Sequence, residues 1–587
     1  MKKIALTLTL SAICYVVAAE RVWTGAAGDG KATSSENWQG DGNDIYFPSS
    51  ASLIDLTGFQ FNNMYINQGL VSLIGDINSC HSVVVAAQND SSAALVKEGG
   101  DWNLNYHLKI PHDGSINNQG VFTNKAGNIT AKLEVSVGKI NNAGNTSGEF
   151  VIEGGDHIFK NNLKFGSGEN VVGKALFILN QGSVSCNGQI GFEGRSGSTC
   201  DIIINGGTFV ANGEIRLGGH NGSRCTIIKN GGILNAQKQG DLSFNLAYSD
   251  NGETYFYHNG GKMSVRSHLD VSNKGSGFFY LNDGSIDVGE TVRFGAWFLD
   301  GPDKAEFHLN GGILSAKAFN YHNGDDNRLA HVFFNGGIFK ATASCAMADS
   351  DYRYGQVRGK EYLHEVLKFN VAERGAVIDT GDFKVIAPVP FKTKEGISKD
   401  GGLWVKGAGS LELLGGVDYN GTTTIEVGAK VLVNSESARK IISNGLKILP
   451  PASITSIQAK AYEVLSLTSE GEFTQEDLDK ITSGQDASEV IKIVFSKSED
   501  GKTILATISA DGFIWTGKAG DNKFSTAGNW LNEEKPQIGA NLYLSSADKV
   551  KLVNDIGNLS SIVILGSSAP IDIDGDFKIN SIYNKST

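Results

Sequence analysis

Carboxylate side chains are the residues of this chain whose type suits hydrolytic chemistry. Hydrolysis of a glycosidic bond needs two carboxylates that face each other across that bond. Four acidic residues fall on outward positions of predicted strands: Asp201, Asp270, Asp287 and Glu306. Their spacing places them on different faces or on distant coils, so we predict no catalytic residue and favour a protein that is not an enzyme. Asp270 and Arg293 occupy equivalent outward positions, which predicts an ordinary surface ion pair.

Aromatic side chains at outward positions predict a contact face. Two residues before a recurring Asn-Gly-Gly turn, successive repeats carry Tyr257, Tyr280, His308 and Phe333. Two positions earlier they carry Tyr255, Phe278, Glu306 and His331. Rows of outward aromatic rings suit sugar rings or a partner protein. The candidate residues for binding a glycan or a surface protein are Tyr255, Tyr257, Phe278, Tyr280, His308 and Phe333. We favour packing of these rings within the chain, with residues 346–366 as a cover, over such a contact face.

The sequence predicts no metal site and no cofactor. The histidines of the repeats fall at unrelated offsets, without a His-x-x-x-His or Cys-x-x-Cys pair: His220, His258, His268, His308 and His331. Asp325-Asp326, and Asp349 with Asp351, lack the spacing of a dedicated calcium loop. No glycine-rich phosphate loop follows a strand, so the glycines are assigned to turns.

A short repeat must position these side chains. Seven copies of an Asn-Gly-Gly pattern, two of them degenerate (Asn-Gln-Gly and Asn-Asp-Gly), are spaced by 25, 25, 29, 23, 28 and 25 residues. Their anchors are Asn180, Asn205, Asn230, Asn259, Asn282, Asn310 and Asn335. A large apolar residue stands three before and four after each anchor. Apolar residues at offsets of two predict strands, because alternate side chains share a face.

Each unit therefore holds three short strands, and Asn-Gly-Gly turns the first into the second. Glycine supplies positive φ without steric cost, and asparagine tolerates left-handed φ. Stacking of equivalent strands about 4.8 Å apart gives a parallel β-helix, with about 25 residues per coil. A propeller needs a longer repeat, of about 40–50 residues per blade, and a leucine-rich horseshoe needs a different consensus.

Composition and charge narrow the class of protein. The chain has 587 residues, with 74 glycines but only 9 prolines, which suits turn-dense β-structure. Its net charge of −12 gives no support for a nucleic-acid partner.

The N-terminus predicts export. Lys2 and Lys3 stand before the apolar run 4–19, a pattern that predicts a secretory signal peptide cleaved before Glu20. No later run of about 18 apolar residues predicts a transmembrane helix.

Cysteines are expected to be inert. Cys186, Cys200, Cys225 and Cys345 fall on inward positions of the predicted coils. Cys200 and Cys225 are expected to stack directly, at a separation within reach of a disulfide, although parallel side-chain vectors would strain that bond. The sequence therefore favours buried free thiols.

The two ends carry a second duplication. WTGAAGDGKATSSENW runs from Trp23 to Trp38, and WTGKAGDNKFSTAGNW runs from Trp515 to Trp530. We interpret these segments as small β-modules that cap the array, in preference to platforms on which sugars stack.

The sequence divides into seven predicted regions. They are a signal peptide (1–19), an N-terminal module (20–80), degenerate coils (81–175), regular coils (176–345), a loop and final coils (346–440), a connector with a short helix begun by Thr474 (441–510), and a C-terminal module (511–587).

Residues 401–433 resemble a known repeat. They contain Gly402-Leu403, Lys406-Gly407-Ala408-Gly409, Leu411-Glu412-Leu413, Tyr419-Asn420-Gly421-Thr422-Thr423 and Gly428. This pattern is similar to the autotransporter-associated β-strand repeat, also called the passenger-associated transport repeat. The resemblance implies a right-handed β-helix in an exported protein and does not imply an enzyme. The C-terminus, IYNKST, shows no predicted barrel strands, so self-transport is not expected.

These observations predict an all-β protein exported by a Gram-negative-type bacterium to the cell surface or beyond. Its expected role is structural, adhesive or surface display, through multivalent weak contacts. The first alternative is a polysaccharide-binding or polysaccharide-degrading β-helix, either a glycosidase or a lyase. The second is a passenger separated from its translocator.

Overall fold

The computed structural model shows a parallel β-solenoid with about 25 residues per turn, in which 53% of the residues are strand and 5% are helix. The described residues are 20–111, 117–138, 145–167, 172–194, 197–219, 222–240, 243–249, 251–295, 304–321, 329–350, 363–450, 461–483, 491–510, 512–531, 533–544, 550–564, 571–576 and 578–584. The predicted signal peptide lies outside them. The chain divides into two compact units, residues 1–226 and 227–587, and each is described by itself.

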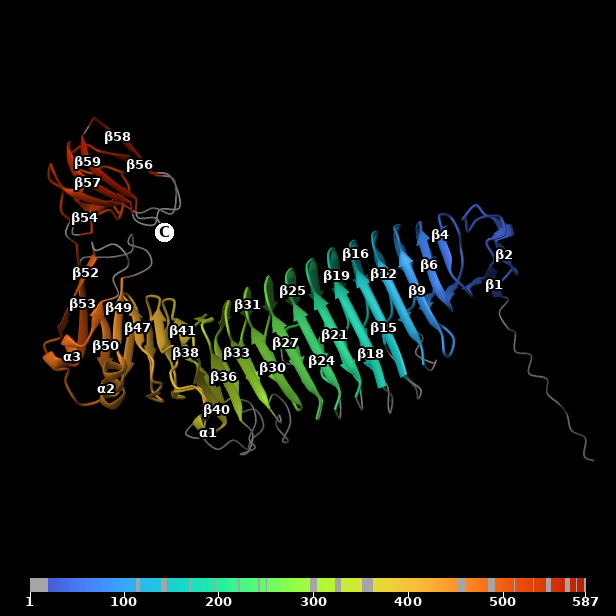
Figure 1. The fold of residues 1–587 in the computed structure, drawn as a ribbon, viewed down its shortest axis with the longest axis horizontal. Helices are drawn as coiled ribbons and strands as arrows, with labels where there is room; N and C mark the ends of the chain where they lie inside the picture. The colour runs from blue at the N-terminus through green and yellow to red at the C-terminus, as the bar shows by residue number, and fades with distance from the viewer. Residues whose placement is uncertain are drawn as a thin grey trace, which may run out of the picture. The chain divides into compact units, whose positions relative to one another are not determined.

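Unit 1 contains three sheets, parallel except for the pair of β1 and β2, and Figure 1 shows their strands stacked in order. Sheet A contains β2 (Trp38–Gln39), β1 (Glu20–Trp23), β3 (Asp44–Phe47), β5 (Asn63–Ile66), β8 (Ser82–Val85), β11 (Leu108–Ile110), β14 (Val135–Val137), β17 (Leu163–Ser167), β20 (Ile190–Glu193) and β23 (Ile215–Leu217). Sheet B contains β4 (Ala51–Asp55), β6 (Gly69–Ile74), β9 (Ser92–Lys97), β12 (Gln119–Asn124), β15 (Asn145–Ile152), β18 (Val172–Leu179) and β21 (Thr199–Ile204), and β24 (Arg224–Lys229) lies at the unit boundary. Sheet C contains β7 (Ile77–Cys80), β10 (Trp102–Leu104), β13 (Ile129–Ala131), β16 (Asp156–Phe159), β19 (Ser183–Cys186) and β22 (Thr208–Ala211).

Unit 2 has sheets of the same three kinds. Its sheet A contains β26 (Phe244–Leu246), β29 (Leu269–Ser272), β32 (Thr291–Phe294), β35 (Ala318–Tyr321) and β39 (Ala348–Ser350). Its sheet B contains β27 (Glu253–His258), β30 (Ser276–Leu281), β33 (Ala305–Leu309), β36 (Ala330–Phe334), β40 (Leu367–Val371), β43 (Phe391–Thr393) and β46 (Val417–Asp418). Its sheet C contains β25 (Ile233–Ala236), β28 (Lys262–Val265), β31 (Ser285–Val288), β34 (Ile313–Ala316), β37 (Ile338–Ala341), β41 (Ala376–Asp379), β44 (Leu403–Lys406), β47 (Thr423–Glu426), β49 (Leu446–Leu449) and β51 (Thr482–Ser483).

A fourth sheet, three helices and a separate group of strands complete unit 2. Sheet D contains β38 (Cys345–Ala346), β42 (Lys384–Ile386), β45 (Ser410–Glu412), β48 (Lys430–Val433), β50 (Ala461–Leu467), β53 (Thr503–Ala510) and β52 (Ile491–Lys497), and the last two join it antiparallel. The helices are α1 (Leu363–Val366), α2 (Ser435–Asn444) and α3 (Gln475–Asp479). The C-terminal strands form a four-stranded sheet of β54 (Phe513–Ile514), β55 (Asn541–Leu544), β57 (Leu559–Ile564) and β59 (Ile579–Asn584), and a pair of β56 (Val550–Val553) and β58 (Ile571–Asp574).

The predicted register is confirmed. In unit 1, Phe177 pairs with Ile202 on the next strand. In unit 2, Phe256, Phe279 and Phe307 follow one another in register, and their rings stack inside the core at 4.7 and 4.9 Å between centroids. Each of these phenylalanines packs against its equivalents on the neighbouring coils, so each coil depends on its neighbours for its core.

Turn glycines explain why two copies of the repeat tolerate substitution. In six copies the residue with positive φ is the second one after the asparagine, as in Gly182 (φ 81°) and Gly284 (φ 80°). A Cβ on Gly284 would stand 2.4 Å from the carbonyl oxygen of Gly261 in the preceding coil. Gln181 and Asp283 replace the other glycine, whose φ is not positive in these copies. The turn therefore requires one glycine and not two.

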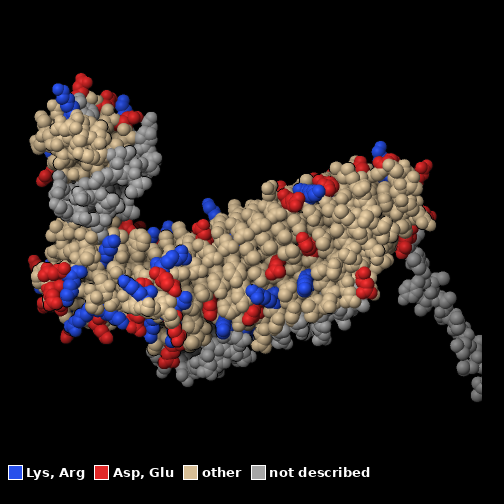
Figure 2. Space-filling view, viewed as in Figure 1, with Lys and Arg blue, Asp and Glu red and all other residues tan. Residues whose placement is uncertain are grey.

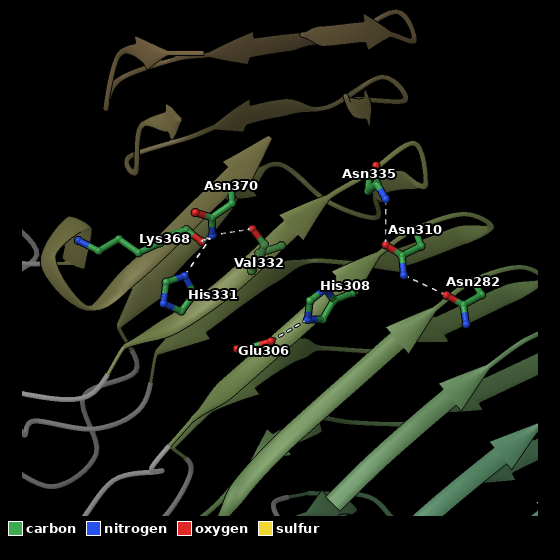
Figure 3. Close-up of polar contacts among 9 residues, drawn as sticks. All are labelled: Asn282, Glu306, His308, Asn310, His331, Val332, Asn335, Lys368 and Asn370. Atoms are coloured by element: carbon green, nitrogen blue, oxygen red, sulfur yellow. Dashed lines mark hydrogen bonds and ion pairs between the residues drawn. The ribbon is translucent and has the colours of Figure 1, made fainter. Parts of the chain in front are cut away.

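The anchor asparagines do not adopt left-handed φ. Their tolerance of that conformation, which the sequence analysis gave as the reason for asparagine, therefore does not explain them. They form amide ladders instead, in which each Nδ2 donates to the Oδ1 of the preceding anchor. In unit 2 the distances are 3.0, 2.8, 3.0 and 3.3 Å along Asn230, Asn259, Asn282, Asn310 and Asn335. Figure 3 shows the last three of these side chains in line. Asparagine recurs because its amide both donates and accepts.

Residues 401–433 complete one coil and begin another. Tyr419 is 1% exposed, and its hydroxyl lies 2.5 Å from Thr423 Oγ1. The Oδ1 atom of Asp400 accepts hydrogen bonds from the backbone N–H groups of Gly402 and Gly421, at 2.8 and 2.9 Å. The tyrosine and glycines of this motif therefore build a corner of the coil.

The short helix predicted at Thr474 is confirmed as α3, with its capping box. Helix α2, which directly follows residues 401–433, was not predicted. Its signals are the N-cap Asn434, whose side chain accepts from Ser437 N, the buried Ala438, Ile441 and Ile442, and Gly445 at the end with φ 106°.

The two Trp-Thr-Gly segments share one hydrogen-bond network. Trp38 Nε1 donates to Ala32 O at 2.7 Å, and Trp530 Nε1 donates to Phe524 O at 2.8 Å. Asn37 and Asn529 each donate through Nδ2 to an aspartate, Asp29 at 2.7 Å and Asp521 at 2.6 Å. The paired tryptophan rings meet edge to face at 5.0 and 5.1 Å.

This packing supports a structural role for the tryptophans, because Trp38, Trp515 and Trp530 are less than 10% exposed. In the N-terminal segment β2 pairs antiparallel with β1 and so covers that edge of sheet A. In the C-terminal segment, the described strands pair only with one another. Capping of the array by the C-terminal segment therefore stays a prediction.

Candidate functional site

The predicted aromatic row lies on the outward face of sheet B in unit 2. Tyr257, Tyr280, His308 and Phe333 occupy paired positions on β27, β30, β33 and β36. Their rings stack with centroid separations of 4.9, 4.5 and 4.4 Å, and the planes are within 18° of parallel. Tyr255 and Phe278 stack beside them at 4.7 Å. The strands thus bring all six predicted site residues together.

The stacking limits how this row can bind. Each interior ring lies between the rings before and after it, so its two faces are covered and its edge faces outward. A sugar that stacks on an aromatic ring needs a free face. The row therefore offers edges and hydroxyl groups. Burial raises the pKa of Tyr280 to about 12, so its phenol stays a neutral hydrogen-bond donor and acceptor at neutral pH.

Polar side chains continue the face of this row. His308 Nε2 and Glu306 Oε2 lie 2.8 Å apart, and His331 Nδ1 lies 3.2 Å from the Nδ2 atom of Asn370 (Figure 3). The hydrogen bond from His308 lowers the pKa of Glu306, and burial lowers the pKa of His331. Of the predicted cover, residues 346–366, the segment 351–362 lies outside the described residues.

The outward carboxylates of unit 2 lie on three different faces, as predicted. Asp270 is on sheet A, Asp287 on sheet C and Glu306 on sheet B. The predicted surface ion pair is wrong in one respect. Arg293 does pair with Asp270, at 2.5 and 3.0 Å between nitrogen and oxygen, but the two side chains are only 1% and 0% exposed.

The whole outward row of this part of sheet A is buried, which explains the error. Asn245, Asp270, Arg293 and Asn320 follow one another in register, and none is more than 9% exposed. An alternating pattern shows which side chains point away from the solenoid core. It does not show whether other parts of the chain cover them.

A groove that sequence reasoning missed lies on sheet B of unit 1. It has a volume of about 520 Å³ and crosses the strands from β6 to β21. Its lining includes Glu149 on β15 and Asp201 on β21, with Leu176 on β18 between them in register. The signal was present, because Glu149 stands four residues before the variant turn at Glu153, as Asp201 stands four before Asn205.

Comparison of the chain with protein families, curated proteins and solved structures finds no match. The chain is therefore placed by its fold alone, as a parallel β-solenoid repeat protein. Residues 401–433, which resemble the autotransporter-associated repeat, do form solenoid coils, but no family model matches them.

Among the described residues, no group of three or more His, Cys, Asp or Glu side chains is placed to hold a metal ion. No helix in this part of the chain has the length and apolar character needed to cross a bilayer. On the face drawn in Figure 2, acidic and basic side chains are interspersed, and no broad area of one sign is visible.

The five cysteines of the described chain are free thiols, and all but Cys345 are buried. Burial, together with the neighbouring Cys225, raises the pKa of Cys200 well above the usual thiol value. Burial also raises the pKa values of Cys80 and Cys186, to about 12 and about 11. The thiolate is the reactive form, so burial suppresses both access and chemistry.

We therefore expect the folded protein to react slowly with a disulfide reagent. In a titration of residues 20–587 with Ellman's reagent, Cys345, which is half-buried, should react first. All five thiols should react after denaturation. Loss of a fast-reacting thiol in a Cys200→Ser variant would contradict this expectation.

Proposed function

We propose that this protein is an exported scaffold with a structural, adhesive or surface-display role. The observation that carries the proposal is the ladder order of the outward side chains. Asparagine amides and aromatic rings repeat in register at each strand, so side chains of one kind recur along a sheet. Such an array suits many weak contacts with a repetitive partner.

Export rests on the N-terminal sequence, where Lys2 and Lys3 precede an apolar run. The proposed partner of the aromatic row is a glycan or a surface protein that contacts ring edges. Tyr257 and Tyr280 would provide hydroxyl groups, and His308 and Glu306 would provide polar neighbours.

The test uses a pair of conservative substitutions. Tyr257→Phe/Tyr280→Phe removes the two hydroxyl groups and keeps the stacked rings. Binding of the purified protein, residues 20–587, is measured on a glycan array and on intact bacterial cells. We expect the wild type to bind and the double variant to bind at least fivefold more weakly. A matched control is Tyr106→Phe, which alters an exposed tyrosine of unit 1 (47% exposed). Equal binding by the double variant and the wild type would remove the aromatic row from the proposal.

Polysaccharide cleavage is the second candidate function, and one observation favours it. Glu149 and Asp201 face the same groove two strands apart, which corresponds to about 9.6 Å along the sheet. At this backbone spacing, two flexible side chains can bring their carboxyl groups to the separation of about 6.5–9.5 Å that inverting glycosidases use. Release of reducing ends from a polysaccharide panel would favour this function, provided that Glu149→Gln abolishes the release.

A further inference from the structure

The groove on sheet B of unit 1 has the dimensions of an extended chain molecule. It crosses six strands, β6, β9, β12, β15, β18 and β21, which are consecutive in the sheet. At about 4.8 Å per strand, the groove is about 24 Å long. A groove of this length runs parallel to the direction in which the coils stack, so it fits a linear polymer better than a compact small molecule.

Glycines of the sheet form part of the groove lining. A Cβ added to Gly148 would lie 2.1 Å from the carbonyl oxygen of Ile110 and 2.2 Å from the backbone nitrogen of Gly138. A Cβ on Gly120 would lie 3.2 Å from Pro111. At these two glycines, the inward side of sheet B therefore packs directly against the backbone that follows β11 and β14.

Two rows of outward side chains give the groove a mixed chemistry. One row runs in register through Leu70, Ala94, Val121, Glu149, Leu176 and Asp201. The second row supplies hydroxyl, amide and ammonium groups, from Ser92, Gln119, Ser147, Lys174 and Thr199. Apolar contacts beside hydrogen-bonding groups match a sugar ring, which has C–H surfaces and hydroxyl groups.

The charges of the lining select among glycans. Glu149 and Asp201 are acceptors when ionised, and they stand one strand to either side of Leu176. A uronic-acid polymer would bring its own carboxylates against these two side chains, and Lys174 is the one basic residue among the described lining residues. The lining thus favours a neutral polymer whose hydroxyl groups donate to the carboxylates.

We propose that this groove binds one extended strand of a neutral polysaccharide along the stacking direction of the coils. One sugar ring rests on Leu176, and its neighbours donate hydroxyl hydrogen bonds to Glu149 and Asp201. The inference is independent of the aromatic row of unit 2, because every residue that it uses lies in unit 1. The scaffold role stands whether or not the groove binds.

The experiment compares matched variants by affinity electrophoresis. Residues 20–587 are run in native gels that contain dextran, galactomannan, xyloglucan, mixed-linkage β-glucan or polygalacturonate. We expect at least one neutral polymer to retard the wild type and polygalacturonate to leave it unretarded. In Glu149→Gln/Asp201→Asn, which keeps the side-chain shapes, the apparent Kd should rise at least tenfold. Leu176→Ser should also weaken retardation.

Two controls separate this proposal from the others. Asp287→Asn alters an exposed outward aspartate on sheet C of unit 2, and it should bind as the wild type does. Tyr106→Phe, which alters an exposed tyrosine of unit 1 that does not line the groove, should likewise leave the retardation unchanged. Circular dichroism confirms that each variant is folded. The proposal is overturned if no neutral polymer retards the wild type, if the groove variants bind equally well, or if polygalacturonate binds most tightly.

Discussion

Replacement of Asp270 by alanine is expected to destabilise unit 2 by about 3–5 kcal/mol, because it leaves the buried Arg293 guanidinium without its carboxylate. Both side chains are at most 1% exposed, so solvent cannot replace the lost partner. Urea-induced unfolding followed by circular dichroism measures the effect as a lower transition midpoint.

The control for this prediction is Asp287→Ala, which removes an exposed carboxylate of unit 2 and should change stability by less than about 0.5 kcal/mol. Asp270→Leu/Arg293→Met, which removes both charges, should recover most of the loss. A single Asp270→Ala variant within about 1 kcal/mol of the wild type would show that the pair is not buried in solution.

Acid is expected to destabilise unit 2 through His258. This side chain is 0% exposed, and burial, followed by the nearby Lys229, lowers its pKa from 6.5 to about 4. Between these values the unfolded chain binds a proton that the folded chain does not. The free energy of unfolding therefore falls as the pH drops from about 6.5 to about 4, by about 3 kcal/mol from this group. Lys229, whose pKa is lowered to about 8, stays charged throughout this range.

The repeat supplies the matched variant, since Leu281 and Leu309 occupy the positions equivalent to His258 on the next two strands. His258→Leu should remove this part of the acid sensitivity. The difference in unfolding free energy between the variant and the wild type should grow by about 3 kcal/mol from pH 7 to pH 4. A constant difference over that range would show that His258 is protonated in the folded protein.

The candidate sites show where sequence patterns are informative. The aromatic row of Tyr257, Tyr280, His308 and Phe333 could be predicted because the repeat register is sharp between residues 176 and 345. Glu149 was missed because its coil carries a variant turn, Glu-Gly-Gly, in place of Asn-Gly-Gly. Extension of the same offset rule to that turn places Glu149 in the outward row with Leu176 and Asp201.

The errors arose because an outward position on a strand can be either exposed to solvent or buried by another part of the chain. Asp270 and Arg293 were predicted to pair, which is correct, but at the surface, which is wrong. Outward alternation is a property of the strand, whereas burial of the outward face depends on what else packs there. The stacked geometry of the tyrosine rings likewise depends on the side-chain torsions of neighbouring coils. The repeat pattern does not specify those torsions.

By itself, the sequence determined the fold class, the turn positions and the register of the regular coils. It could do so because period-two strands and one obligatory turn glycine per coil are local requirements that repeat seven times. Only the tertiary structure decided that asparagine amides form a ladder, that the Asp270–Arg293 pair is buried and that sheet B of unit 1 is hollowed into a groove. Each of these depends on the distances between side chains of different coils and different faces, and backbone periodicity does not fix those distances.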